Sequence, residues 1–216
     1  LALGLAHEIK NPLTTLKTFS EYLPQKLEDK AFLEKFAKLI PEEVERINSI
    51  VHQLLDFSKP APPSFKDVFI HNLIHDILEL LSNDFLKRKI KISESFDDIN
   101  LLLKADPAQL KQALLNIILN AMEAMPNGGS ISIKTTPRQA NYLEIEITDE
   151  GCGIAKKDLK HIFDPFFSTK ESGTGLGLSI SYQIIKNHKG TITVESELGK
   201  GTTFRIRLPM EMLVGL

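Results

Sequence analysis

The first 57 residues carry apolar side chains at the spacing of long amphipathic helices. In residues 1–27 they recur every three or four positions, which places them on one helix face. In residues 31–57 the pattern becomes a heptad repeat with two parallel series: Leu33, Ile40, Ile47 and Leu54, and Ala37, Val44 and Val51. The break between the two patterns, at residues 28–30, is short. The sequence therefore predicts an antiparallel helical hairpin.

The heptad seam indicates that this hairpin has a partner. Charged residues lie outside the seam, but two helices alone cannot enclose an apolar core. Further helices from a second copy would do so, and we expect a dimeric four-helix bundle. Pro41 lies inside the second pattern, where it predicts either a kink or the start of a separate helical segment.

The rest of the chain alternates between strand and helix patterns. Period-two alternation predicts strands at 131–133, 143–147, 191–195 and 202–208, and helical spacing predicts helices at 72–87, 107–125 and 176–187. A proline-rich stretch at 59–64 separates this region from the hairpin. We therefore predict two domains, residues 1–60 and 65–216, of which the second is an α/β sandwich with a mixed sheet.

Composition narrows the class of protein. Of the 216 residues, 42% are hydrophobic and 25% are charged, which is the balance of a folded domain. The net charge of -2 gives no reason to expect a nucleic acid partner. A single cysteine, Cys152, excludes an internal disulfide.

Several features bear on location. No apolar run approaches the roughly 20 residues of a membrane helix, and no secretory signal opens the chain, so a cytoplasmic location is the default expectation. The chain begins inside a helical pattern without a starting methionine or an N-cap residue. We interpret it as a fragment, with any sensing region or membrane anchor lying upstream.

His7, Glu8 and Asn11 form a candidate site on the first predicted helix. His7 falls off the apolar face, and Asn11 follows one turn later on the same side. A neutral imidazole is a nucleophile, and a neighbouring carboxylate can hold its Nδ1 proton while Nε2 attacks. The alternative is a surface histidine without a role. We adopt that alternative for the histidines that lack such surroundings: His52, His71, His75, His161 and His188.

A second candidate site consists of polar residues in the helical pattern at 107–125. The sequence contains no G-x-x-x-x-G-K-[ST] motif, so a P-loop is excluded. Polar side chains instead form one strip on a largely apolar helix: Gln109, Gln112, Asn116, Asn120 and Glu123. The amide oxygens of Asn116 and Asn120 suit Mg²⁺ beside phosphates. The alternative is a solvated helix face.

Two glycine-containing segments fit a nucleotide. Asp149 is predicted at a strand end, where its carboxylate can accept a hydrogen bond from an adenine amino group. Gly151 and Gly153 follow, and they allow the backbone to pass close to a base. Further glycines precede a helix and expose backbone amides to an anion: Gly173, Gly175 and Gly177. The alternative for this last segment is a flexible loop without a ligand.

The segment between the two glycine motifs has the features of a lid. Lys170 can reach a β- or γ-phosphate. Three aromatic residues lie in an otherwise loop-like stretch, where their rings can anchor a lid when nucleotide is bound: Phe163, Phe166 and Phe167. The alternative is a small satellite hydrophobic cluster.

Together these segments resemble the transmitter module of bacterial sensor histidine kinases, in the same order and over nearly the whole chain. The segment from His7 to Pro12 resembles the phosphoacceptor box, and Asn116-x-x-x-Asn120 is similar to the N box. Residues 149–153, 163–167 and 173–177 resemble the first glycine box, the F box and the second glycine box. Residues 199–202 resemble a last, minor glycine motif. The short lid is most similar to that of the nitrogen-regulation branch.

The resemblance implies an α+β protein, in which the hairpin forms a dimeric four-helix bundle and the second domain is a Bergerat-type ATP site. It implies that Asp149 reads adenine and that Asn120, with Asn116, binds Mg²⁺. The phosphate tail of ATP would contact Lys170 and the backbone of the following glycine segment: Gly173, Thr174, Gly175, Leu176 and Gly177.

The resemblance also implies a reaction. His7 would attack the γ-phosphorus of ATP with Glu8 as base, and then pass the phosphoryl group to an aspartate of a response regulator. Asn11 would help to orient the water that dephosphorylates that regulator. Two other interpretations are a different Bergerat ATPase, which would lack the histidine-bearing hairpin, and an inactive scaffold, which would not need intact residues at every site.

Overall fold

A computed structural model describes residues 2–58, 62–96, 101–138, 141–170 and 173–210; for residues 2–8, 49 and 52–58 it describes the backbone only. The chain divides into two compact units. One consists of residues 1–61 with 165–176, and the other of residues 62–164 with 177–216. In the described part of the chain, no helix is both long and apolar enough to span a membrane.

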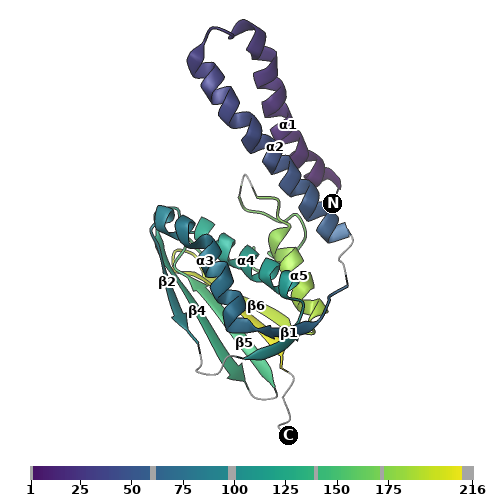
Figure 1. Ribbon diagram of the computed structural model, residues 1–216, viewed down its shortest axis with the longest axis vertical. Helices are drawn as coiled ribbons and strands as arrows, with labels where there is room; N and C mark the ends of the chain where they lie inside the picture. Colours follow the sequence, from purple (N-terminus) through teal and green to yellow (C-terminus); the bar gives the residue numbers. More distant parts are fainter. Residues whose placement is uncertain (1, 59–61, 97–100, 139–140, 171–172, 211–216) are drawn as a thin grey trace. The chain divides into compact units, whose positions relative to one another are not determined.

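The first unit contains the predicted antiparallel hairpin (Figure 1). Helix α1 (Ala2–Tyr22) runs into a short 3-10 turn, η1 (Leu23–Gln25), and helix α2 (Lys30–Ser58) returns beside it. Helix α1 ends earlier than the apolar pattern, because Pro24 disfavours the helical conformation at Leu23. Asp29 then begins α2, since its carboxylate accepts a hydrogen bond from the Phe32 amide at 3.1 Å.

Helix α2 continues without interruption through Pro41. A separate segment starting at this proline, one of the two expected outcomes, is therefore not formed. Apolar packing on both sides of Pro41 offsets the hydrogen bond that the proline removes. Before it, Phe36 stacks on Phe19 of α1 with ring centroids 6.4 Å apart, and after it, Ile50 is buried.

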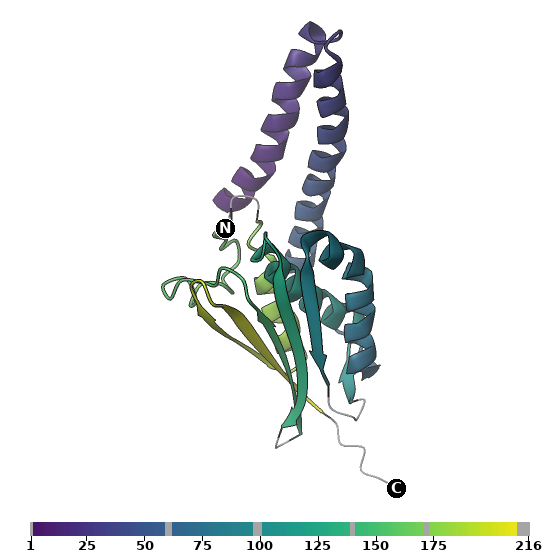
Figure 2. The ribbon, with the colours of Figure 1, turned by 90° about the vertical axis from the view of Figure 1, so that its left-hand side faces the viewer.

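The second unit is the predicted mixed α/β sandwich, with helices on one face of a five-stranded sheet (Figure 2). The helices are α3 (Ile70–Arg88), α4 (Pro107–Glu123) and α5 (Gly177–Asn187). The sheet has the order β2-β4-β5-β7-β6, with β2 parallel to β4 and the other neighbours antiparallel. Its strands are β2 (Ile90–Ser95), β4 (Gly129–Arg138), β5 (Tyr142–Asp149), β6 (Thr191–Glu197) and β7 (Gly201–Pro209).

Two further strands lie outside this sheet. Strands β1 (Lys66–Phe69) and β3 (Leu102–Ala105) form a small antiparallel sheet of their own. They and β2 were not predicted. Strands β1 and β3 have four residues each, too few for a period-two pattern to stand out from the surrounding sequence.

The alternation along β5 determines where Asp149 lies. Leu143, Ile145 and Ile147 are buried on the side that the helices cover. Residues two apart in a strand point to the same face, so Asp149, the last residue of β5, continues this buried row. Asp149 as a whole residue is consequently only 3% exposed.

Two histidines expected on the surface are buried instead. The Nε2 atom of His71 lies 2.9 Å from the hydroxyl oxygen of Thr135. His188 is hydrogen-bonded at both ring nitrogens: Nδ1 lies 2.8 Å from the Ile184 carbonyl oxygen, and Nε2 accepts the amide of Asp106 at 2.9 Å. Polar rings can be buried when they find such partners, and these partners lie far away along the sequence or in a neighbouring turn.

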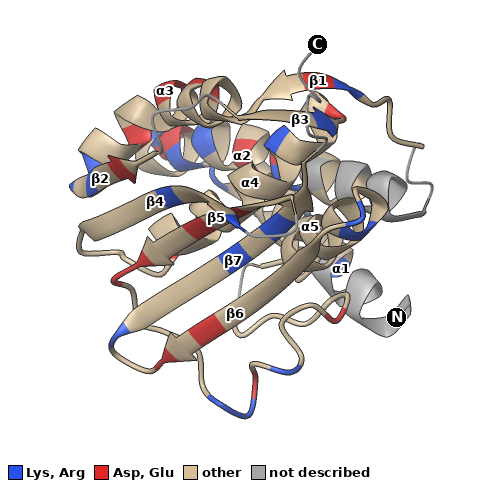
Figure 3. Ribbon diagram, turned by 90° about the horizontal axis from the view of Figure 1, so that it is seen from below, with Lys and Arg blue, Asp and Glu red and all other residues tan. Residues whose placement is uncertain are grey.

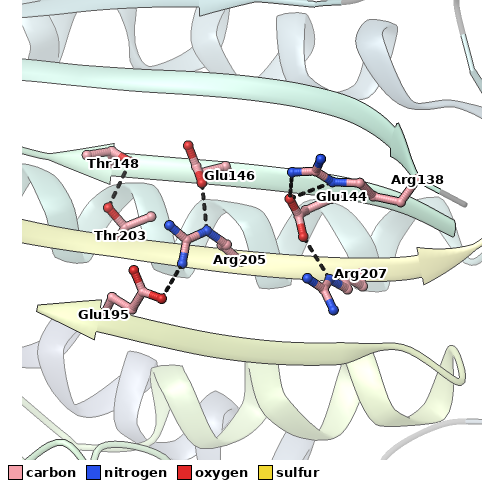
Figure 4. Close-up of polar contacts among 8 residues, drawn as sticks. All are labelled: Arg138, Glu144, Glu146, Thr148, Glu195, Thr203, Arg205 and Arg207. Atoms are coloured by element: carbon pink, nitrogen blue, oxygen red, sulfur yellow. Dashed lines mark hydrogen bonds and ion pairs between the residues drawn. The ribbon is translucent and has the colours of Figure 1, made fainter.

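The other face of the sheet carries ordered ion pairs (Figures 3 and 4). Glu144 of β5 lies between two arginines of the adjacent strands. Its carboxylate accepts from Nε of Arg207 at 2.7 Å and from Nε of Arg138 at 3.0 Å, and it is only 3% exposed. A second row runs parallel to the first and consists of Glu146, Arg205 and Glu195.

These contacts set the protonation of Glu144. Desolvation alone would raise the pKa of its carboxyl, but the hydrogen bonds and charges of Arg138 and Arg207 outweigh this effect and lower the pKa. A carboxyl with a lowered pKa contributes stability above its unfolded-state pKa. That contribution is lost as the pH falls through the folded-state pKa.

We predict that Glu144→Gln destabilises the second unit by about 1–2 kcal/mol at pH 7, because it leaves two arginines without their charged partner. The difference from wild type should shrink as the pH falls below about 4.3. Urea unfolding at several pH values measures both effects. Glu146→Gln is the matched control, with a smaller expected loss because Arg205 keeps Glu195. Equal stability of Glu144→Gln and wild type at pH 7 would contradict the prediction.

Candidate functional site

The turn after β5 orients the carboxylate of Asp149. Its Oδ1 atom accepts a hydrogen bond from the Gly151 amide at 2.8 Å. Gly151 has no space for a side chain, since a β-carbon there would lie 2.6 Å from the β-carbon of Ala124 and 2.7 Å from Oδ1 of Asp149. Buried carboxylates require such partners. The turn and the carboxylate therefore form one local structure.

Gly153 makes a second close approach in the same turn. Its φ angle is 70°, and a β-carbon would lie 2.1 Å from the carbonyl oxygen of Glu197. Only glycine accommodates both conditions. The sequence suggested that Gly151 and Gly153 allow close passage of the backbone past a base. In the structure, the atoms close to them belong to Ala124 and Glu197 of the protein itself.

Helix α4 presents the predicted polar strip beside this turn. Asp106 caps its first turn, where Oδ1 accepts from the amides of Ala108 at 3.0 Å and Gln109 at 3.1 Å. One face of the helix is buried, with Leu110, Ala113, Leu114, Ile117 and Ile118 in the core, whereas Leu119 is 36% exposed. Asn116 and Asn120 are partly exposed. The polar strip therefore lies on a partly exposed side of the helix, outside its buried face.

Asn116 joins α4 to the start of α5. Its Nδ2 atom donates to the carbonyl oxygen of Gly177 at 3.1 Å and lies 3.4 Å from the hydroxyl of Ser181. A carbonyl accepts and cannot donate, so this contact assigns the orientation of the amide. The side-chain oxygen of Asn116 therefore points away from the Gly177 carbonyl. Ser181 is fully buried, and sequence reasoning missed it, because a lone serine in a helix carries no motif.

Residues 165–176, in the first unit, contain a loop whose two ends are joined. The amide of Phe166 donates to the carbonyl oxygen of Gly175 at 3.0 Å. Gly175 has a φ of 63°, and a β-carbon there would lie 2.5 Å from the carbonyl carbon of Phe166. Phe166 itself has a φ of 66°, an unusual value for an aromatic residue. Phe166, from the F box, and Gly175, from the second glycine box, are therefore parts of a single loop.

Polar contacts order the described residues inside this loop. The hydroxyl of Ser168 accepts from the amide of Lys170 at 3.1 Å, and the hydroxyl of Thr174 accepts from the amide of Leu176 at 3.4 Å. Gly173 packs close to Ser168, where a β-carbon would lie 2.7 Å from the serine hydroxyl oxygen. Lys170 is exposed.

Phe163 lies apart from that loop, in the second unit. Its ring packs against Tyr182 of α5 and Phe204 of β7, with centroid distances of 5.3 and 6.5 Å. This packing corresponds to the satellite cluster that was the alternative interpretation of the aromatic segment. It fixes the chain just before residue 165 onto α5.

The candidate nucleophile belongs to the first unit. The backbone of His7 and Glu8 lies in α1, and their side chains are outside the described residues. Asn11 is exposed. It borders a groove of about 580 Å³ on the same helix, lined by Lys10, Asn11, Thr14, Thr15, Thr18 and Phe19.

Comparison with known proteins gives the family. Residues 105–212 match the family described as histidine kinase-, DNA gyrase B-, and HSP90-like ATPases, and residues 1–63 match the His Kinase A (phospho-acceptor) domain. The chain is 38% identical over 212 residues to the sensor histidine kinase ZraS of Escherichia coli (strain K12), covering 98% of this chain and 45% of ZraS. It is 39% identical over 211 residues to sporulation kinase E of Bacillus subtilis (strain 168), covering 97% and 28%.

A solved structure agrees over both parts of the chain. Histidine kinase ThkA, in its complex with the response regulator protein TrrA, matches with a TM-score of 0.82 and 30% identity, covering 95% of this chain and 60% of that chain. An ATPase fold preceded by a phosphoacceptor hairpin defines the class. The chain belongs to the histidine kinase family, with the module order of a sensor histidine kinase core. It spans less than half the length of ZraS and sporulation kinase E.

Proposed function

We propose that this chain is the catalytic core of a two-component sensor kinase that binds ATP, phosphorylates His7 and passes the phosphoryl group to an aspartate of a response regulator. The observation that carries the proposal is the buried, turn-held carboxylate of Asp149 beside the polar strip of α4. Such a carboxylate is suited to reading an exocyclic amine. The helix with the His-Glu-x-x-Asn sequence supplies a nucleophile in the same chain.

The nucleotide-binding residues have distinct roles in this proposal. Asp149 accepts a hydrogen bond from the adenine amino group, on the turn shaped by Gly151 and Gly153. Lys170 neutralises phosphate charge. The start of α5 and the preceding glycine segment offer backbone amides to the phosphates, from Gly173 through Thr174, Gly175 and Leu176 to Gly177. Phe163 anchors the chain that leads into this segment.

Mg²⁺ fits the donor set of α4. Asn116 and Asn120 would supply neutral amide oxygens one turn apart. The side-chain nitrogen of Asn116 donates to Gly177, so its side-chain oxygen is the atom that would bind the metal. We place Asn120 first among these ligands and Asn116 second. When bound, Mg²⁺ neutralises charge that develops on the β- and γ-phosphate oxygens.

The reaction itself requires mainly positioning. Glu8 holds the Nδ1 proton of His7, so that the Nε2 lone pair forms a bond to the γ-phosphorus. The bond from that phosphorus to the bridging oxygen breaks, and its electron pair leaves with ADP. In the second step an aspartate oxygen of the regulator attacks the same phosphorus, and the imidazole leaves. Because ATP is the donor, we place the chain in the cytoplasm.

We predict that His7→Gln abolishes the acid-labile, base-stable phosphate formed from ATP while ATP affinity stays within a few-fold of wild type. The reason is that the nucleophile and the turn of Asp149 belong to different units. Labelled ATP followed by acid and base treatment measures the first effect, and calorimetry measures the second. ATP hydrolysis without a phosphoprotein would favour a different ATPase of the same fold. Wild-type labelling of His7→Gln would exclude His7.

The hairpin also supports a homodimer. Several apolar side chains on it are exposed to a degree unusual for a helical seam: Leu13 at 50%, Val44 at 44% and Val51 at 40%. A second copy that packs on this face would complete a four-helix bundle.

We predict that Ile47→Glu converts a wild-type dimer into a monomer or an aggregate, because a charge in the bundle core costs several kcal/mol. Sedimentation at micromolar concentration measures the state. Asn48→Glu adds the same charge at the exposed neighbouring position and should remain dimeric. A monomeric wild type would contradict the bundle.

The regulator is proposed to dock on the hairpin beside His7. The relative ThkA was solved with the response regulator TrrA, and α1 of this chain offers a groove beside Asn11. An amide at this position can orient a water molecule toward the phosphorylated aspartate, although it cannot replace the imidazole as nucleophile. One turn of helix would therefore carry both activities.

We predict that Asn11→Ala slows dephosphorylation of the regulator about ten-fold or more but largely preserves phosphorylation of His7, since one positioning hydrogen bond is lost. Glu8→Ala should show the opposite defect. The first assay uses pre-phosphorylated regulator with ADP, and the second uses ATP alone. Normal dephosphorylation by the Asn11→Ala variant would contradict the proposed role of Asn11 in orienting water.

A further inference from the structure

The hairpin between β6 and β7 closes around the turn that follows Asp149. The amide of Gly199 donates to the carbonyl oxygen of Cys152 at 2.8 Å. Gly201 has a φ of 102°, and a β-carbon there would lie 1.9 Å from the carbonyl oxygen of Asp149. Together with the approach of Gly153 to Glu197, these contacts give the minor glycine motif at residues 199–202 a structural purpose. It brings the backbone of the hairpin against the turn.

Ser196, at the base of this hairpin, makes hydrogen bonds both to the turn and to the opposite strand of the hairpin. Its hydroxyl oxygen accepts from the amide of Ile154 at 2.8 Å, and the hydroxyl donates to the carbonyl oxygen of Gly201 at 2.8 Å. The hydroxyl oxygen of Thr202 lies 3.0 Å away. A serine hydroxyl has one donor and two acceptor lone pairs, so Thr202 donates and all three bonds coexist.

The turn from Gly151 to Ile154 connects the hydrogen bond of Ser196 to the carboxylate of Asp149. At its far end, Ile154 is held by Ser196, and in its middle the amide of Cys152 donates to the carbonyl oxygen of Ala124 at 3.1 Å. At its near end, the amide of Gly151 holds the carboxylate at 2.8 Å. Only two residues, Cys152 and Gly153, therefore separate the amide held by the serine from the amide that orients Asp149. A shift of Ile154 would move the carboxylate.

We propose that Ser196 is a positioning residue for nucleobase recognition, which sets the preference for adenine over guanine by fixing the turn that orients Asp149. The inference rests on the proposed contact between Asp149 and adenine. Adenine presents a 6-amino donor where guanine presents a 6-oxo acceptor. Discrimination between them depends on where the carboxylate lies, whereas contacts to the phosphates do not distinguish them.

The test compares ATP and GTP affinities of the whole chain by displacement of a fluorescent ATP analogue. Ser196→Ala leaves the amide of Ile154 and the carbonyl of Gly201 without their side-chain partner. We expect ATP affinity to fall about five- to ten-fold, GTP affinity to fall less, and their ratio to drop accordingly. Ser196→Thr retains the hydroxyl and should restore the ratio.

Thr203→Val is the matched control. It removes the hydroxyl of the residue next to Thr202. The hydroxyl oxygen of Thr203 lies 3.0 Å from that of Thr148 in β5, and both lie on the face of the sheet that carries the ion pairs, opposite the buried row that contains Asp149 (Figure 4). The ratio of ATP to GTP affinity should remain that of wild type. Melting temperatures of all variants separate a loss of stability from a loss of selectivity.

A lower melting temperature of Ser196→Ala with a wild-type ratio would overturn the proposal, because the serine would then be structural only. If the alanine variant does not fold, Ser196→Cys places a weaker hydrogen-bonding atom at the same position, and the same two outcomes apply. Asp149→Asn distinguishes this proposal from the one it rests on. Unchanged ATP affinity in that variant would remove Asp149 from the site, whatever the behaviour of Ser196.

Discussion

The buried carboxylate of Asp149 is the constraint around which the second unit is organised. A carboxylate removed from water needs hydrogen-bond partners, and here the Gly151 amide is one of them. That contact requires a turn so tight that Ala124 and Glu197 occupy the space of the missing side chains of Gly151 and Gly153. The end of α4, the last hairpin and the core strand β5 therefore meet at one carboxylate.

The sheet holds this arrangement in register from its other face. Strands β5 and β7 pair Asp149 with Thr202 at one end and Glu144 with Arg207 toward the other. A slip of one residue would move Asp149 out of the buried row and would also separate Glu144 from Arg207. The ion pairs on the open face thus favour the same register as the apolar core.

The division of the chain into two units matches the chemistry proposed for it. Transfer of a phosphoryl group needs in-line positioning more than covalent assistance from the protein. In the proposed function the nucleophile lies on one unit and the carboxylate that would read adenine on the other, so phosphorylation would require the two to be brought together. The exposed apolar residues on the hairpin are the surface that the proposed second copy would cover.

The sequence by itself determined the features that depend on local periodicity. The heptad seam of α2, the alternation of β5 and the order of the glycine motifs predicted the hairpin, the mixed sandwich and the family. Only the tertiary structure decided the rest. It buried His71 and His188, assigned the amide of Asn116 through Gly177, and joined Ile154 to Ser196. The last two contacts link residues 61 and 42 positions apart. Such pairings depend on how the sheet and helices bring distant segments together, and no local pattern in the chain records them.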